Sequence, residues 1–219
     1  MTSTAKNYRT KSSNRAEAAM EWLEIHSREA FWAGIAVVVI AGGVWFYQKS
    51  QAAQTRNAYA ALDEAEQALN SGNLPLAQSD LERMVKRYGS TEAGKVGTIL
   101  LAQVHYQKGE YQAGIDALKP LTTTEEHYFS ANALSLAAAG YEQLRKYPEA
   151  AENYRLASTK AIYDTDKAGY LAASARALTL AGKTAEAKAV WTQLASDPTG
   201  PIAVEARVRL GEMSAAGGW

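Results

Sequence analysis

The sequence predicts an all-α protein with one N-terminal transmembrane helix, a solenoid of about four helix-turn-helix repeats and a C-terminal capping helix. Three observations lead to this fold class. An apolar stretch occupies residues 31–47, a pattern with a period of about 37 residues follows it, and the apolar residues of that pattern recur at spacings of three and four. Stacked helix pairs of this kind bury their apolar sides against their neighbours.

The composition excludes several classes of protein. Lys plus Arg and Asp plus Glu each total 23, so the chain lacks the excess positive charge that nucleic-acid binding needs. Cysteine is absent, which excludes disulfides and thiolate metal sites and leaves the redox compartment open. With 47% hydrophobic and 21% charged residues, the chain has the composition of a protein with a packed core. We therefore expect no nucleic-acid partner.

The residues before the apolar stretch divide into two segments. Residues 1–13 are rich in Thr, Ser, Lys and Asn and are predicted to form a disordered cytoplasmic tail. In residues 14–29, apolar side chains recur at helical spacing with glutamates on the opposite side. Asn14 and Glu17 form a helix start signal of the capping-box type. This segment is predicted to be an amphipathic helix on the membrane surface.

The stretch from Phe31 to Tyr47 contains no charged side chain and predicts a transmembrane helix over residues 30–49. The stretch spans about 25 Å at 1.5 Å per residue, and its flanks are expected to supply the rest of a hydrocarbon core of about 30 Å. Aromatic residues at both ends are predicted membrane-interface anchors: Phe31, Trp32, Trp45, Phe46 and Tyr47. Small residues are candidates for transmembrane packing against a partner helix: Gly34, Ala41, Gly42 and Gly43.

Two alternatives exist for this stretch. A buried core helix rarely has aromatic residues at both ends and no charge between them. A cleaved signal peptide would use residues 50–52 as its cleavage site, although an unusually long segment precedes the stretch and bulky aromatics with Lys49 intervene. Basic residues are more numerous before the stretch than after it, which keeps the N-terminus cytoplasmic. The expected location is the bacterial inner membrane, crossed once, with the C-terminal domain in the periplasm.

Residues 50–215 form the predicted solenoid, because four turns recur there at intervals of 37, 36 and 37 residues. The equivalent turn residues are Gly72, Gly109, Arg145 and Gly182. Seven residues before them stand Ala65, Ala102, Ala138 and Ala175, and five residues after them stand Ala77, Gly114, Ala150 and Ala187. Four residues further on are larger groups: Leu81, Leu118, Tyr154 and Trp191. Small side chains at the first two positions allow the two helices of a repeat to approach closely.

The C-terminal part continues the helical pattern after an interruption. Residues 197–201 read DPTGP and break the last repeat helix, after which residues 202–213 are predicted to form a helix that caps the stack. Residues 216–219 form a tail that is expected to be loose unless a partner buries Trp219.

The turns KGEYQAG and RKYPEA, together with the small positions, resemble tetratricopeptide repeats, whose period is about 34 residues. The tryptophan early in the usual signature is absent, and alanine replaces the glycine of the first helix. The resemblance implies a concave groove, lined by the first helix of each repeat, that binds other proteins. The candidate groove residues are Tyr59, Leu62, Glu66, Leu69, Val96, Ile99, Gln103, Tyr106, Asn132, Ser135, Glu142, Ala172, Arg176 and Thr179.

The layout of residues 14–215 resembles the YfgM-like family of ancillary subunits of the SecYEG translocon. The resemblance includes the amphipathic lead, the apolar stretch, AYAALDEAEQAL and the segment from DLERMVKRYG to YQAGIDAL. It implies an inner-membrane scaffold or adaptor whose periplasmic repeat domain associates with the translocon and with envelope chaperones. The alternative is an accessory structural subunit that stabilises a large inner-membrane complex, respiratory or photosynthetic. The sequence alone does not separate these two functions.

The sequence contains no constellation typical of an enzyme. His26, His105 and His127 are far apart, and no metal-ligand motif, phosphate-binding loop or nucleophile elbow occurs. The acidic pair at residues 125–126 and the pair at 164 and 166 fall in turns between repeats, where they are expected to start helices. We therefore expect no catalysis, no metal and no cofactor. The expected partners are other membrane proteins, periplasmic proteins and the lipid bilayer.

Overall fold

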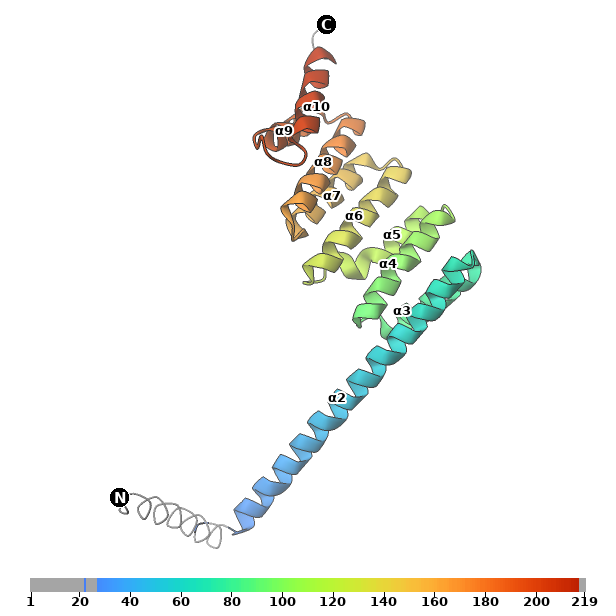
Figure 1. Ribbon diagram of the computed structural model, residues 1–219, viewed down its shortest axis with the longest axis vertical. Coiled ribbons are helices and arrows are strands. Elements are labelled where there is room, and N and C mark those ends of the chain that lie inside the picture. Colours follow the sequence, from blue (N-terminus) through green and yellow to red (C-terminus); the bar gives the residue numbers. More distant parts are fainter. Residues whose placement is uncertain (1–21, 23–26, 217–219) are drawn as a thin grey trace, which may run out of the picture. The chain divides into compact units, whose positions relative to one another are not determined.

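The computed structural model describes residue 22 and residues 27–216, and every regular element in that part is a helix (Figure 1). The helices are α2 (Ser27–Asn70), α3 (Leu74–Tyr88), α4 (Glu92–Gln107), α5 (Tyr111–Thr122), α6 (His127–Gln143), α7 (Tyr147–Lys160), α8 (Asp164–Leu180), α9 (Thr184–Ala195) and α10 (Ala203–Ala216). The predicted tail at 1–13, most of the helix predicted for 14–29, and Trp219 lie outside the described residues.

The chain consists of two compact units, Met1–Gln54 and Thr55–Trp219. In the first unit the described structure is the N-terminal part of α2. The side chains predicted as membrane-interface anchors are exposed there: Phe31, Trp32, Trp45, Phe46 and Tyr47. The predicted packing residues Gly34, Ala41, Gly42 and Gly43 are exposed as well. This stretch of helix therefore presents apolar side chains that nothing within the described residues covers.

The prediction of a transmembrane helix is wrong. Across the residues that the structure describes, no helix combines the length and the apolar character that crossing a membrane requires. The apolar stretch spans only about 25 Å of a hydrocarbon core of about 30 Å. Within the same helix it is followed directly by the polar residues Gln48, Lys49 and Ser50, so the flank does not extend it. This finding overturns the transmembrane helix over residues 30–49 and the single-pass inner-membrane location that depended on it.

The second unit has the predicted all-α solenoid. Each of its helices packs mainly against the helix before it and the helix after it. The first helices of the four repeats, called here the A helices, are the part of α2 from residue 55 together with α4, α6 and α8. The second helices, called the B helices, are α3, α5, α7 and α9. Helix α10 follows the last of these.

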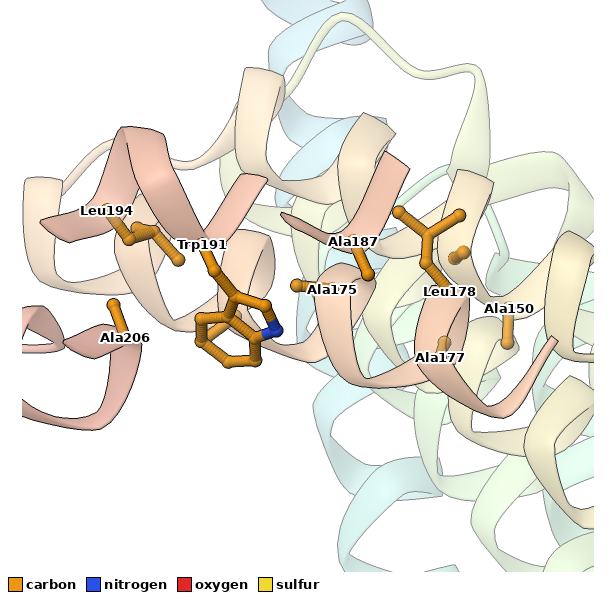
Figure 2. Close-up of a cluster of buried hydrophobic side chains, with 10 residues drawn as sticks. Ala150, Ala175, Ala177, Leu178, Ala187, Trp191, Leu194 and Ala206 are labelled. Carbon is orange, nitrogen blue, oxygen red and sulfur yellow. The ribbon is translucent and has the colours of Figure 1, made fainter. Parts of the chain in front are cut away.

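The small residues of the repeat pattern lie at the contacts between A and B helices. Their exposed fraction is 0% at Ala65, Ala102, Ala138 and Ala175 on the A helices and at Ala77, Ala150 and Ala187 on the B helices. The larger residue four positions further along each B helix fills the adjoining space, and Leu81, Leu118 and Trp191 are at most 1% exposed. Trp191 belongs to one cluster with Ala175, Ala187, Leu194 and Ala206 (Figure 2). The complete burial of these small residues agrees with a close approach of the paired helices.

The turn inside each repeat uses a left-handed backbone conformation. The value of φ is +75° at Gly72, +77° at Gly109, +75° at Gly182 and +56° at Arg145. In each turn, the amide of the following residue donates a hydrogen bond to the carbonyl four residues before the turn residue, at 2.8–3.0 Å. These bonds satisfy carbonyl groups that the end of the A helix leaves open. The third repeat therefore forms the same turn without the glycine that best suits it.

Exchange of the turn residue tests this account. Arg145→Gly should raise the free energy of unfolding by about 0.5–1 kcal/mol, because the left-handed conformation costs a residue with a Cβ atom roughly 1 kcal/mol. Gly182→Ala, at the equivalent turn of the fourth repeat, should lower it by about 1 kcal/mol for the same reason. Urea denaturation followed by circular dichroism measures both changes. Two shifts of the same sign would show that the turn conformation does not control stability.

Candidate protein-binding face

The candidate site is the side of the solenoid formed by the A helices, to which α10 adds at the C-terminal end. We call this side the A-helix face. Every predicted groove residue lies on one of the A helices. The structure therefore brings these residues to one series of alternate helices, as the register of the repeats predicts, and none lies on a B helix.

The predicted residues differ in how far they reach the surface. Leu62, Ile99 and Ala172 are 8%, 9% and 0% exposed, so they belong to the core between helices. Six others are half-buried between neighbouring helices: Leu69, Val96, Tyr106, Asn132, Ser135 and Glu142. The exposed members are Tyr59, Glu66, Gln103, Arg176 and Thr179. A surface for a partner is therefore available over only part of the predicted set, and its role in binding stays a prediction.

A groove of about 490 Å³ lies between α6 and α8. Helix α6 lines it with Asn132, Ser135, Leu136 and Ala139, and α8 lines it with Thr165, Asp166, Gly169, Tyr170 and Ala173. Tyr154 reaches it from the intervening B helix α7, and its hydroxyl donates a hydrogen bond to Glu142 Oε2 at 3.3 Å. Burial, reinforced by the nearby Glu142 carboxylate, raises the pKa of Tyr154 to about 12.

A second groove of about 420 Å³ lies one repeat further on, between α8 and α10. Its lining residues are Arg176, Thr179 and Leu180 from α8, Trp191 from α9, and Arg209, Glu212 and Met213 from α10. The arginines are paired with carboxylates, since Arg176 Nη1 lies 2.7 Å from Glu205 Oε1 and Arg209 Nη1 lies 3.0 Å from Glu212 Oε2. Leu180 is 60% exposed. The groove is thus apolar inside and has a charge-balanced polar edge.

In the second repeat, a tyrosine occupies the space between successive A helices. Tyr106 stands three residues before its turn residue, as Thr179 does in the fourth repeat, and its hydroxyl donates to the carbonyl of Leu136 at 3.0 Å. A Cβ atom on Gly114 or Gly140 would overlap the Tyr106 side chain, so both glycines make room for it. Burial raises the pKa of the Tyr106 hydroxyl. Because Thr179 is smaller, the equivalent space near Trp191 stays open.

Several groove residues were not predicted from the sequence. Gly169, Tyr170, Leu180, Arg209 and Met213 line the two grooves without belonging to the predicted set. Three residues before the turn, the four repeats have Leu69, Tyr106, Glu142 and Thr179, and the small Thr179 was the available signal for the second groove. Two of these residues lie on α10, which was predicted to act only as a cap.

The histidine on the A-helix face has a structural partner. His105 Nδ1 lies 2.7 Å from Glu110 Oε2, and Lys108 Nζ lies 2.6 Å from the other oxygen of the same carboxylate. Hydrogen bonds from Lys108 and His105 lower the pKa of Glu110. Over the described residues, no group of three or more potential metal ligands forms. His105 is therefore held by a hydrogen bond within its own repeat.

The tyrosine at the floor of the first groove gives a pH-dependent prediction. Because the folded-state pKa of Tyr154 is raised above 10, its contribution to stability is complete below pH 10 and is lost as the pH rises towards 12. Glu142→Gln should lower this pKa while burial keeps it above 10. The pKa of Tyr154 is measured by ultraviolet titration, as the difference between the phenolate absorbance of the protein and that of its Tyr154→Phe variant. A Tyr154 that titrates near 10 in the native protein would contradict the described burial.

Comparison with known proteins agrees with this geometry. Residues 20–133 match a family model described as a tetratricopeptide repeat-like domain. Two crystal structures of nearly identical TPR-like repeats from a putative kinesin light chain of Podosopora anserina, one of them a variant, are similar to this chain. Each has a TM-score of 0.57 and 18% identity, over 75% of this chain and 88% of the other. Likeness at this identity shows the fold alone.

No match was found among curated proteins. Tetratricopeptide-like repeats generally mediate protein–protein interactions, and the matches indicate no enzyme family. The matched segment covers more than half of the 219 residues and includes the first two repeats. The chain therefore belongs to the family of tetratricopeptide repeat-like domains.

Proposed function

We propose that the protein is a non-catalytic scaffold or adaptor that binds a segment of another protein along the A-helix face. The observation that supports this most directly is the pair of adjoining grooves, one between α6 and α8 and one between α8 and α10. Each has a large aromatic side chain of a B helix at its base and polar side chains at its edge. Apolar pockets with a few polar groups are the usual form of recognition sites.

The side chains of the grooves indicate the chemistry of the bound segment. Tyr154 and Trp191 offer apolar contact, while Asn132, Ser135 and Asp166 at the first groove supply hydrogen-bonding groups. The arginines at the second groove already pair with carboxylates, so no excess charge selects the partner. The bound segment should therefore place an apolar side chain in each groove and keep polar groups between them.

For the identity of the partner, we propose the Sec translocon or envelope chaperones that serve secreted proteins. The support is the resemblance of residues 14–215 to the YfgM-like family. Crosslinking in intact cells, followed by mass spectrometry, tests this assignment. Enrichment of translocon subunits or of secretory chaperones is expected, and their absence from the crosslinked material would exclude it.

A second candidate is an accessory structural subunit of a large respiratory or photosynthetic complex. The exposed apolar side chains of α2 between Phe31 and Tyr47 favour it, because an apolar surface of this kind marks a contact site. Purification in mild detergent separates the candidates. A stoichiometric complex that survives purification favours the structural subunit, whereas release of the free chain favours the adaptor.

Filling the grooves should remove partner binding without unfolding the solenoid. Leu180→Trp, at a position that is 60% exposed, enlarges a side chain that lines the groove between α8 and α10. Gly169→Tyr fills the groove between α6 and α8, where a Cβ atom meets nothing within 4 Å. Recovery of the crosslinked partner should fall at least tenfold for the double variant. The matched control is Gln193→Tyr, at an exposed position of α9, which should bind normally.

The melting temperature of each variant serves as the check on folding. Partner recovery that is unchanged in the folded double variant would show that the grooves do not form the binding site.

A further inference from the structure

Helix α10 stands at the position of an A helix in the repeat register. The turn residues Gly72, Gly109, Arg145 and Gly182 are separated by 37, 36 and 37 residues, and Gly218 follows after a further 36. Gly211, seven residues before Gly218, therefore corresponds to the buried alanines of the four A helices. Helix α10 continues the repeat pattern.

The A helices bury one particular face beneath the B helix and the following A helix. This face consists of the residues 14, 10 and 7 positions before the turn residue. In the first repeat they are Ala58, Leu62 and Ala65, which are 0%, 8% and 0% exposed and cluster with residues of α3 and α4. In the fourth repeat, Ala172 and Ala175 are both 0% exposed. At these positions of the four A helices, only Lys95, Ser135 and Ala168 are half-buried and the other residues are buried, so the same side of each A helix is mainly a helix-packing surface.

On α10 this face is uncovered. The corresponding residues are Val204, Val208 and Gly211, and the two valines are 68% and 55% exposed. The opposite side of the same helix is well packed, since Ala203 and Ala206 are 1% and 0% exposed. A Cβ atom at Gly211 would meet nothing within 4 Å, so another helix has room to approach there. Among the described helices, none lies over this face.

We infer that the face formed by Val204, Val208 and Gly211 is a docking surface for an amphipathic helix of another protein. That helix takes the place that α3, α5, α7 and α9 take in their own repeats. The basis is continuity, because the surface extends an interface that the chain already forms four times. A second copy of the chain is less suited to supply the docking helix, since each of its B helices is already packed within its own repeat.

The B helices define the chemistry of the incoming helix. Each has a small residue that contacts the A helix and a large apolar residue four positions later, as with Ala77 and Leu81 or Ala187 and Trp191. The docked helix should therefore carry Ala or Gly opposite Gly211 and a large apolar side chain one turn later. Polar residues should cover its outer side.

A peptide with the sequence of residues 182–196, which comprises the last turn and α9, is the probe. A labelled peptide should bind the full chain saturably in fluorescence anisotropy. Val208→Glu should weaken binding at least tenfold, and because Val208 is exposed this variant should keep its fold. Gln193→Glu adds the same charge at an exposed position of α9 and should leave binding unchanged. A peptide with Ala187 and Trp191 both replaced by Glu should not bind.

In a second experiment, the probe helix is fused to the C-terminal end of the chain. Residues 183–196 appended after Gly218 should raise the melting temperature by about 3 °C or more and slow amide exchange in α10. Val208→Glu should abolish both effects. Absence of stabilisation would overturn the inference, and stabilisation without binding of the free peptide would overturn the assignment to a separate protein. A dimer in analytical ultracentrifugation that Val208→Glu dissociates would show that a second copy is the occupant.

Discussion

The close approach of two helices at a pair of small side chains is the contact on which the rest of the structure depends. The alanines at 65, 102, 138 and 175 face the small residues at 77, 114, 150 and 187, and no larger side chain fits without moving a helix. Because this contact recurs at nearly constant intervals, each repeat presents the same side to the next one. The solenoid is the result, and its core consists largely of alanine with a few large residues such as Leu81 and Trp191 behind the contact.

The candidate binding face follows from what this arrangement leaves unfilled. Successive A helices are separated by a B helix, so the space between them depends on the side chains that reach into it. Tyr106 fills that space in the second repeat, whereas Thr179 leaves it open in the fourth, and Trp191 then forms the base of a groove. The side-chain sizes at this repeat position and at the residues facing it thus decide whether the space is packed or open to a partner. Helix α10 also has positions left unfilled. At the repeat positions that are buried on the A helices, α10 has Val204, Val208 and Gly211, which are in contact with solvent.

The sequence predicts the helical repeats well, because the features that produce them are local and periodic. The turn glycines, the alanines and the large residue of each B helix recur at fixed distances, and all lie where the pattern places them. The grooves were less predictable, since Leu62, Ile99 and Ala172, which all stand ten residues before a turn residue, are covered by neighbouring helices, whereas Ser135 at the same repeat position lines a groove. Whether a residue is exposed depends on contacts between repeats, and the spacing of residues along the chain does not reveal those contacts. The transmembrane helix was predicted from the apolar character of residues 31–47 and from the aromatic residues at both ends of the stretch, without giving weight to the polar residues that continue the same helix.

The claim that close helix contact at small residues holds the solenoid together is tested most directly by enlarging one of them. Ala175 is 0% exposed at the contact between α8 and α9, whereas Ala189 is exposed on α9. Ala175→Leu should lower the free energy of unfolding by about 2–3 kcal/mol, because the added atoms force the helices apart. Ala189→Leu should change it by less than about 0.5 kcal/mol. Equal effects of the two substitutions in urea denaturation would contradict the account.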